Sequence, residues 1–469
     1  MTAAHSLRPR QLLPQPGAPG GAFRVTAVAS LIAVHVALGF GGALSRHVAT
    51  AQAVLTVVVS VFVWFWSTRP DRIIAVTVYG GLCDVYWRMA QSSAPWELSK
   101  YLLAAGAIVL LVRFVRSWAG AVLPAAMLLV LVPGMVNAAM TDGIGTARDN
   151  ISSYEMAFIA LAFAAMAFRH IVGTKADAWN LAWIALGPLI AVLSATTYFV
   201  ATTPDIEFGS ESNFAVTGGY GPNQVSSILG LIMLICVLIA FLPMARRYWP
   251  LLAFLSLWSL WATFLTFSRG GIYSLALAGG AMLLVGVSSR GARTRSLLLA
   301  GAAALAIVAV FGSANDFTSN ALDTRYEDKG TASRTNIAEM DLDVWAEHPL
   351  TGVGSGRAPE FRPHEFRSEA AAHTEYTRVV AEHGVLGLVA LTLLVAILVQ
   401  AYRRGLGYWN RLMVVALSMW ALTTMLHAAT RVGAVAVMLA VTQLRVEDAA
   451  RGPSPSRPSP SREPNRTRS

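Results

Sequence analysis

Charged residues are scarce in this sequence of 469 residues, where Asp, Glu, Lys and Arg make up only 13%. Soluble globular domains contain roughly 25% of these residues, so the charge here is too low to cover several water-facing domains. Hydrophobic residues make up 55%, which excludes an intrinsically disordered chain, because disorder requires low hydrophobicity and high charge. The apolar residues occur in blocks of about 18–25, long enough to cross a hydrocarbon core of about 30 Å as helices. The sequence therefore predicts a polytopic membrane protein.

Cysteine is also nearly absent. The two cysteines, Cys83 and Cys236, both lie inside apolar blocks. Two such residues exclude a disulfide scaffold, and their number and flanking residues do not fit a zinc or iron–sulfur site. We therefore predict two free cysteines in helix cores, no metal and no cofactor.

The apolar blocks divide the chain into about fourteen candidate spans. They cover approximately residues 23–44, 50–66, 72–90, 98–116, 119–140, 154–172, 177–201, 222–243, 247–266, 270–287, 296–313, 378–402, 409–426 and 431–445. The predicted fold class is all-α, a polytopic transmembrane helical bundle of about 12–14 spans. The first span is too long for the core of a signal peptide and is expected to remain as an anchor.

The composition outside the spans sets the domain limits. Residues 1–22 are rich in Pro and Gly, and residues 446–469 are rich in Pro, Ser and Arg. Both compositions are typical of disordered extensions. Between them we predict a bundle of about eleven spans at 23–313, one large loop at 314–377 and further membrane helices at 378–445.

The positions of the basic residues follow the predicted membrane topology. The formal net charge is +10, and basic residues gather in every second connection between spans, as in Arg69, Arg116, Arg246 and Arg290. Loops rich in Arg and Lys stay in the cytoplasm. The pattern therefore predicts that both termini are cytoplasmic and that the loop at 314–377 is external. Because the charge follows topology in this way, nucleic acid is not expected as a partner.

The external loop contains twelve acidic and six basic residues, and a structured loop of this length is usually functional. Within it, residues 333–348 carry Ile337, Met340, Val344 and Trp345 on one helical face and acidic residues on the other. Ser333 can cap this helix and Pro349 ends it. We predict an amphipathic helix that lies along the external membrane surface, and a second helix that begins near residue 368 and continues into the span at 378–402.

Ionisable residues are rare within the predicted spans. Asp84 and Arg88 are four residues apart in one span and can pair on one helical face. A buried pair can be functional, but we favour a local structural pair. A proton-coupled transporter often requires a series of acidic or histidine residues through the membrane, and no such series is present.

Polar residues gather instead at the external ends of the spans, in three clusters. The first is Gly-Gly-Tyr-Gly-Pro-Asn-Gln at 218–224, which places Asn223 in the first turn of a helix; the simpler interpretation is a loop-to-helix turn. The second is Thr-Phe-Ser-Arg-Gly-Gly at 266–271. Its Arg269 lies at the interface, where a guanidinium can bind phosphate oxygens. An arginine that only extends toward lipid headgroups is an equally good interpretation.

The third cluster belongs to the external loop. It consists of Arg334, the segment His-Pro-Leu-Thr-Gly-Val-Gly-Ser-Gly at 348–356, and His-Thr-Glu-Tyr-Thr-Arg at 373–378. The glycines do not indicate a nucleotide site, because no strand precedes them and the compartment is external. His373 is a candidate general base, since an imidazole with a pKa near 6.5 accepts a proton at neutral pH. A histidine on a surface without a role is the alternative.

The ordered set of clusters resembles the O-antigen ligase and O-antigen polymerase superfamily of bacterial envelope glycosyltransferases. The residues that carry the resemblance are Ser268 to Gly271, His348 to Gly356 and His373 to Tyr376, followed by Glu382 to Leu388. The part that bears motifs covers roughly residues 215–390, and the N-terminal half is similar only as a set of spans.

The resemblance implies a GT-C-like, metal-independent transferase that acts on an undecaprenyl-pyrophosphate-linked glycan. Carried over by motif, Arg269 binds the pyrophosphate, Arg334 is a second ligand and His373 is the catalytic base. Two departures stand out: Thr374 replaces the family's asparagine, and residues 214–220 contain no arginine. Arg148 and Arg378 are candidates for the missing ligand. The expected supporting residues are Asn223, Ser268, Gly270, Gly271, Gly352, Gly354 and Tyr376.

The expected function is transfer of a lipid-linked oligo- or polysaccharide to an acceptor sugar at the outer face of the bacterial cytoplasmic membrane. A lipid A–core acceptor would make the protein a ligase, and the end of another lipid-linked repeat would make it a polymerase; both remain open. The alternative from another class is a transporter or flippase of lipid-linked sugars. A peptidoglycan polymerase of the shape-and-division type is a third possibility that suits the motif order less well.

Overall fold

The structure is a computed structural model that describes residues 22–209, 211–327, 332–363, 374–405, 407–427 and 432–447, with the side chains of 332–335 excluded. Its α-helices are α1 (Val25–Leu44), α2 (Arg46–Trp66), α3 (Pro70–Leu82), α4 (Asp84–Met89), α5 (Leu98–Phe114), α6 (Val122–Asn150), α7 (Met156–Phe168), α8 (Lys175–Thr202), α9 (Pro222–Ala240), α10 (Trp249–Leu265), α11 (Arg269–Ser288), α12 (Arg293–Phe317), α13 (Ala321–Glu327), α14 (Ala332–Glu347), α15 (Glu375–His383), α16 (Val385–Arg404), α17 (Gly407–Thr424) and α18 (Gly433–Val441). The π-helix η1 (Ile151–Glu155) joins α6 to α7, and the 3₁₀ turns are η2 (Ala215–Thr217), η3 (Pro243–Tyr248) and η4 (Ala358–Phe361). The strands are β1 (Val172–Thr174) and β2 (Arg445–Glu447).

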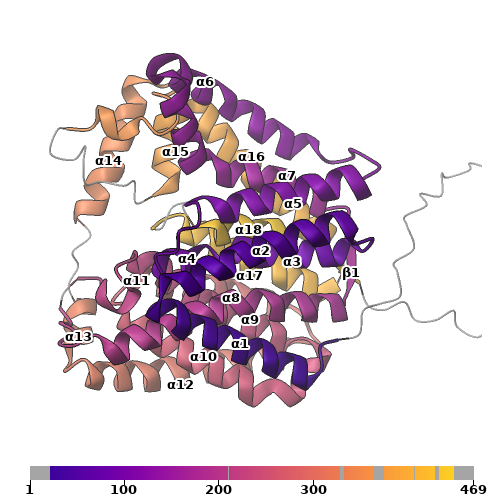
Figure 1. Cartoon of the computed structure of the whole chain (residues 1–469), viewed down its shortest axis with the longest axis vertical. Coiled ribbons are helices and arrows are strands. Elements are labelled where there is room, and N and C mark those ends of the chain that lie inside the picture. Colours follow the sequence, from indigo (N-terminus) through magenta and orange to yellow (C-terminus); the bar gives the residue numbers. More distant parts are fainter. Residues whose placement is uncertain are drawn as a thin grey trace, which may run out of the picture.

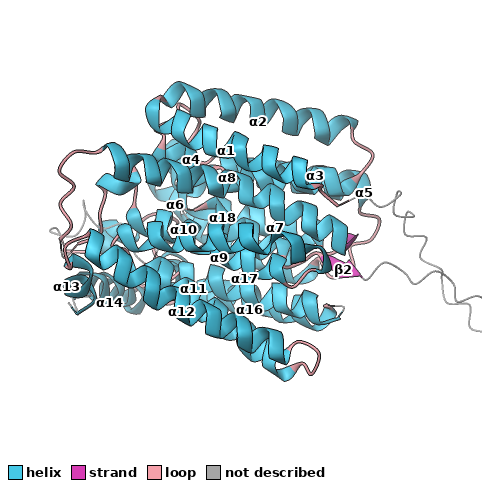
Figure 2. Cartoon of the chain, turned by 90° about the horizontal axis from the view of Figure 1, so that it is seen from below, coloured by secondary structure: helices cyan, strands magenta, loops and turns pink. Residues whose placement is uncertain are grey.

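The helices form a bundle that confirms the predicted fold class. Within the described residues, nine helical segments are long and apolar enough to cross a membrane. Most of them run in the same general direction across the molecule, which two perpendicular views show (Figures 1 and 2). The buried core includes side chains from both halves of the chain, such as Trp183 and Trp420. Close van der Waals packing and hydrogen bonds between the helices hold the bundle together, since lipid is as apolar as the helix faces.

Several predicted spans differ from the observed helices. The predicted span 72–90 is divided at Cys83 into α3 and α4, and the predicted spans 119–140 and 154–172 belong to one helical segment, Val122–Phe168, with a kink at Gly143. The predicted span 378–402 is divided at Gly384, whose φ of 62° is not helical. Hydropathy averages over these positions, so it does not detect the breaks.

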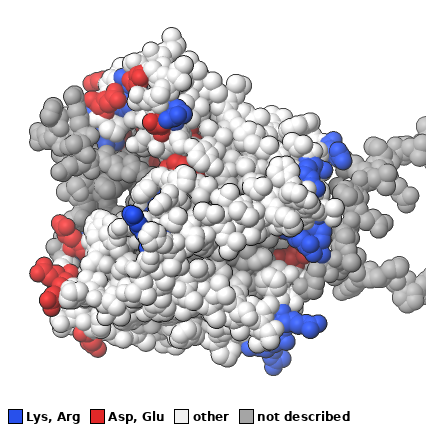
Figure 3. Space-filling view, in the orientation of Figure 1, with Lys and Arg blue, Asp and Glu red and all other residues white. Residues whose placement is uncertain are grey.

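The charged side chains lie mainly at the two ends of the bundle. Lys and Arg predominate at the right end in Figure 3, Asp and Glu predominate at the left end, and uncharged residues cover the region between them. We call these the basic end and the acidic end. The described parts nearest both termini lie at the basic end: the Phe23 amide donates to Asn180 Oδ1 at 2.8 Å, and β2 pairs with β1 in parallel. The charge pattern predicts that both termini lie on the same side of the membrane, and the position of these two segments agrees with it. The orientation of the bundle in a membrane stays a prediction.

The loop between α12 and α16 carries α13, α14 and α15 at the acidic end (Figure 1). The predicted helix is observed as α14, with Ile337 and Val344 buried. Its apolar residues are not confined to one face, because Leu342 is exposed. The prediction that all its acidic residues face away is wrong for Asp341, which is fully buried and pairs with Arg362 at 2.6 Å. Burial of a carboxylate is possible there because an arginine compensates its charge. A position of α14 on the membrane surface stays a prediction.

The pair of Asp84 and Arg88 is confirmed, with Arg88 Nε 3.0 Å from Asp84 Oδ1. The Arg88 guanidinium also lies over the Trp96 ring at 4.3 Å and donates to the Tyr220 hydroxyl at 3.1 Å. Glu97 and Lys100 form a second buried pair nearby at 2.5 Å. These contacts join α4 and α5 to the segment at 218–224, which supports the structural interpretation of the pair.

Candidate active site at the acidic end

The first two predicted clusters form one polar junction between α9 and α11. Ser268 Oγ donates to Asn223 Oδ1 at 2.7 Å and accepts from Ser226 Oγ at 2.8 Å. Ser226 Oγ in turn accepts from the Gly271 amide at 3.2 Å. The two segments are more than forty residues apart in the sequence, so the junction holds the turn that precedes Arg269 in a fixed place.

Gly270 and Gly271 permit close packing around this junction. A Cβ atom on Gly271 would lie 2.3 Å from the Ser226 carbonyl oxygen, and one on Gly270 would lie 2.4 Å from Nδ1 of His427. Both glycines were predicted as supporting residues of the site. In the structure the close groups are the α9 backbone and a buried imidazole, so we assign both glycines to helix packing.

Arg269 is the first residue of α11 and is half-buried. Its guanidinium donates to the carbonyl of Arg325 in α13, while Arg325 Nε donates to the Phe267 carbonyl at 2.9 Å. Arg269 therefore lies where the loop at 314–377 contacts the start of α11. The N-terminus of a helix favours anions, as does a guanidinium. This position is compatible with the predicted phosphate contact, which stays a prediction.

The start of α15 lies against the same part of the bundle. His373 lies outside the described residues, and so does the side chain of Arg334. Thr374, the next residue, caps α15 by accepting from the Tyr376 amide at 3.2 Å. The Glu375 amide donates to the Met425 carbonyl at 2.8 Å, two residues before His427. The end of α17 thus contacts both the beginning of α15 and Gly270, the neighbour of Arg269.

The hydroxyl of Tyr376 is held by a hydrogen bond to α17. Its hydroxyl donates to the Leu422 carbonyl at 2.8 Å, and burial raises the pKa of this hydroxyl to about 12. The side chain therefore fixes α15 to α17. This contact agrees with the predicted supporting role of Tyr376.

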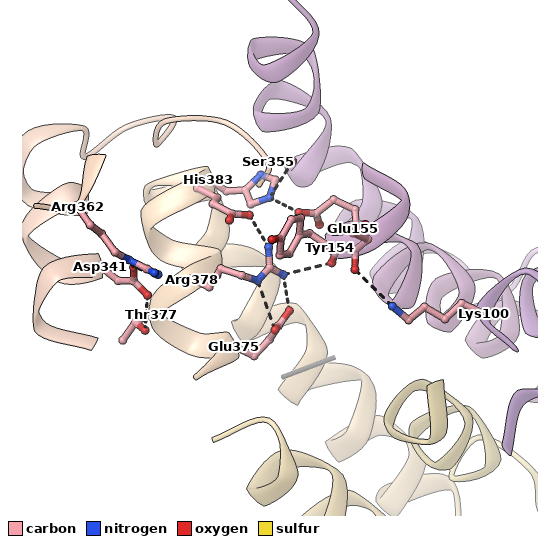
Figure 4. A network of polar contacts seen from close by, with 12 residues as sticks. Lys100, Tyr154, Glu155, Asp341, Ser355, Arg362, Glu375, Thr377, Arg378 and His383 are labelled. Carbon is pink, nitrogen blue, oxygen red and sulfur yellow. Dashed lines mark hydrogen bonds and ion pairs between the residues drawn. The ribbon is translucent and has the colours of Figure 1, made fainter. Parts of the chain in front are cut away.

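Arg378 is the centre of a buried network of ionisable groups (Figure 4). Its side chain is 2% exposed and pairs with Glu375 and Glu382 of its own helix and with Glu155 of η1, the last at 3.5 Å. It also donates to the Tyr154 carbonyl at 3.2 Å. Burial lowers the pKa of the guanidinium, but the carboxylates outweigh this and raise the pKa well above its ordinary value.

This arrangement contradicts the prediction that Arg378 is a pyrophosphate ligand. A guanidinium enclosed by three carboxylates presents no open face to an anion, and the nearby negative charge would repel phosphate. Arg148 differs, because its side chain is 78% exposed and pairs with the adjacent Asp149 at 2.9 Å. An exposed pair of this kind is weak and can open to a ligand. The predicted role of Arg148 therefore stays a prediction.

The glycine-rich segment at 348–356 wraps around the end of α15. The Gly354 amide donates to the Glu382 carbonyl at 2.9 Å, and a Cβ atom on Gly352, whose φ is 66°, would lie 2.3 Å from the carbonyl carbon of Glu382. Only glycine fits such a close approach at positive φ. The segment brings Ser355 Oγ to 3.5 Å from His383 Nε2, which also lies 3.0 Å from Glu155 Oε1. Gly352 and Gly354 therefore position this network.

One group of side chains has the composition of a metal site. The ligand atoms of Glu155, Glu382 and His383 lie within 4.8 Å of one another, and all three residues are buried. The Arg378 guanidinium already contacts both carboxylates and supplies positive charge at this place. These residues fit a salt-bridge network better than a metal site, and the expectation of no metal stays a prediction.

An apolar recess of about 410 Å³ lies beside this network. Leu342 and Trp345 of α14, Tyr376 and Val380 of α15, and Leu388 and Leu391 of α16 line it. The recess therefore extends from the beginning of a candidate span, Val385–Arg404, to α14.

Sequence reasoning missed four residues of the network: Glu155, Glu375, Glu382 and His383. Glu155 could have been found as an acidic residue at the edge of the apolar block 154–172, because an ionisable group in a span is often functional. Glu382 and His383 lie inside a motif that carried the resemblance, but nothing in the sequence assigned them a role.

Substitution of Glu382 by glutamine is expected to flatten the pH dependence of stability. Burial raises the pKa of Glu382 from 4.5 to about 7; Arg378 opposes this shift and Glu155 adds to it. Between these values the folded protein keeps a proton that the unfolded chain has lost. The free energy of unfolding therefore falls as the pH rises through this window, by up to about 1.4 kcal/mol per pH unit for one group.

Thermal unfolding in detergent between pH 4.5 and 8 checks this expectation. The wild-type melting temperature should fall from pH 4.5 to about 7 because of this group, and the fall should be smaller in Glu382→Gln. Equal slopes in the two proteins would contradict the pKa assigned to Glu382.

Residues 254–392 match the family model described as O-antigen ligase. The matched segment contains Arg269, the loop with α13 and α14, and all of α15. No curated protein and no solved structure matches the chain. The match confirms the resemblance inferred from the ordered motifs, while Asn223 and Glu155 lie before the matched segment.

Proposed function

We propose that this chain, a member of the O-antigen ligase family by its residues 254–392, transfers a glycan from undecaprenyl pyrophosphate to an acceptor sugar. The family match is the observation that carries the proposal. Transfer takes place at the outer face of the bacterial cytoplasmic membrane, with both termini in the cytoplasm. The segregation of basic and acidic side chains to opposite ends supports this orientation (Figure 3).

The chemistry follows from the residues at the acidic end. His373 accepts the proton of the acceptor hydroxyl, and the resulting oxygen attacks the anomeric carbon of the donor glycan. The bond between that carbon and the pyrophosphate oxygen breaks, and the lipid pyrophosphate leaves with additional negative charge. Arg269, with Arg334 as a second ligand, stabilises this charge. No metal is required, because the guanidinium groups supply the positive charge.

Two features of the structure support this assignment. The beginnings of α11 and α15, which follow Ser268 and Thr374, both lie against the end of α17. Arg269 and the residue after His373 therefore belong to one region. The apolar recess between α14, α15 and α16 lies beside α15 and offers a place for part of the polyprenyl chain.

A transfer assay with the purified protein tests the proposal. The wild-type protein is reconstituted with a labelled lipid-linked glycan and either a lipid A–core acceptor or a second lipid-linked repeat. A larger product with the first acceptor indicates a ligase, and a larger product with the second indicates a polymerase. Movement of the labelled donor across liposomes without any larger product would contradict the proposal and favour a flippase.

A further inference from the structure

A carboxylate from the N-terminal half of the chain reaches the helix that follows His373. Glu155 is 0% exposed and lies 3.0 Å from His383 and 3.5 Å from Arg378 (Figure 4). It precedes the segment that matches the O-antigen ligase family, and 228 residues separate it from His383. The matched segment therefore depends on a contact from outside its own limits.

The local backbone explains how Glu155 reaches this place. It ends the π-helix η1, where the Met156 amide donates to the Ile151 carbonyl five residues earlier. Such π-helical turns occur frequently at functional sites. Two consecutive carbonyl groups of this turn accept hydrogen bonds from cationic side chains. The Tyr154 carbonyl accepts from Arg378 at 3.2 Å, and the Ser153 carbonyl accepts from Lys100 at 3.4 Å. The turn thus presents Glu155 and the Tyr154 carbonyl to α15 together.

The charges show what Glu155 adds to the network. Arg378 already has two carboxylate partners on its own helix, Glu375 and Glu382. The third carboxylate partner of Arg378, Glu155, comes from η1 and not from α15. Neutralising it leaves Arg378 paired, so the cation does not become an isolated buried charge. What is lost is the ionic connection between α15 and the segment Val122–Phe168.

We propose that Glu155 is a positioning residue: through Arg378 and His383 it fixes the rotation and depth of α15, whose capping residue Thr374 directly follows His373 in the sequence. This inference rests on the proposed function, because it assigns His373 to the reaction. Misplacement of a reacting group by about 1 Å can reduce a rate by about 10²-fold. Glu155 itself touches no reacting atom.

Glu155→Gln is the principal test, with Glu155→Asp as the conservative variant and Asp177→Asn as the control. Asp177 caps α8 at the basic end, where its side chain accepts from the Thr174 amide at 2.8 Å. In the glycan-transfer assay, Glu155→Gln should reduce kcat by about 10- to 100-fold while the KM for the donor stays within about twofold. Glu155→Asp should recover part of the rate. Asp177→Asn should lower the melting temperature, because a helix cap is lost, and leave kcat close to wild type.

Hydrogen–deuterium exchange provides a readout that does not require activity. Amides of α15, residues 375–383, should exchange faster in Glu155→Gln than in the wild type, while those of α9 remain unchanged. An unchanged kcat and unchanged exchange in Glu155→Gln would overturn the inference, as would an equal loss of kcat in Asp177→Asn. An inactive wild-type protein would contradict the proposed function, and the exchange measurement would still decide whether Glu155 holds α15.

Discussion

His373→Ala is expected to reduce glycan transfer by about 10²- to 10⁴-fold, the usual contribution of a positioned general base. The acceptor hydroxyl has a pKa far above neutral, so its proton must leave as the new bond forms. Without the imidazole, the attacking oxygen has no acceptor for this proton. The measurement is kcat of the purified variant with a saturating lipid-linked donor, after its melting temperature has been shown to match that of the wild type.

His348→Ala is a suitable control for this substitution. His348 belongs to the same external loop and is exposed, and its ring lies beside Phe361 at 5.3 Å. Its loss should leave transfer near the wild-type rate, because a surface histidine has no part in the proposed reaction. Normal transfer by His373→Ala would remove His373 from the mechanism. A wild-type rate that does not fall below pH 6.5, where an ordinary imidazole is protonated, would argue against it as well.

Arg269→Ala is expected to have an effect of similar size, a decrease of about 10²- to 10³-fold in kcat, because a fixed donor to the developing charge is lost. The KM for the donor should also rise, since the pyrophosphate carries charge before the reaction begins. Arg269→Lys should recover only part of the activity, because lysine keeps the positive charge but not the two parallel hydrogen bonds of a guanidinium. Steady-state kinetics of both variants with the lipid-linked donor measure these effects.

The control for Arg269 is an arginine at the opposite end of the bundle. Arg290 is exposed in the short connection between α11 and α12, and Arg290→Ala should leave transfer unchanged. If Arg269→Ala transfers glycan normally with an unchanged KM, Arg269 does not bind the pyrophosphate. In that case its contact with the Arg325 carbonyl is its structural role.

Local patterns in the sequence were sufficient for the fold class and for some elements of the loop. Apolar blocks of spanning length identify membrane helices because every backbone polar group must be paired within the bilayer. The spacing of Ile337 and Val344 correctly indicated the helix α14. Asn223 and Ser268, both chosen as supporting residues, do contact each other at 2.7 Å. In each case the information lies within a short stretch or in the order of motifs.

The partners of the charged residues required the tertiary structure. Arg378 was a candidate for the phosphate ligand missing from residues 214–220, yet Glu375, Glu382 and Glu155 enclose it. Asp341 looked like a solvated residue on a polar face, yet Arg362 pairs with it in a buried position. A single sequence records which residues can ionise, but not which of them share a buried volume.

The sequence by itself therefore determined that this chain is a membrane helical bundle and that its residues 254–392 resemble the O-antigen ligase family, since hydropathy and motif order are properties of the chain alone. Only the tertiary structure decided that Glu155 meets Arg378 and His383, because residues 228 positions apart come together through helix packing. The free energy of burying their charges depends on that meeting, since each ionised group is tolerated in the interior only when an opposite charge lies beside it.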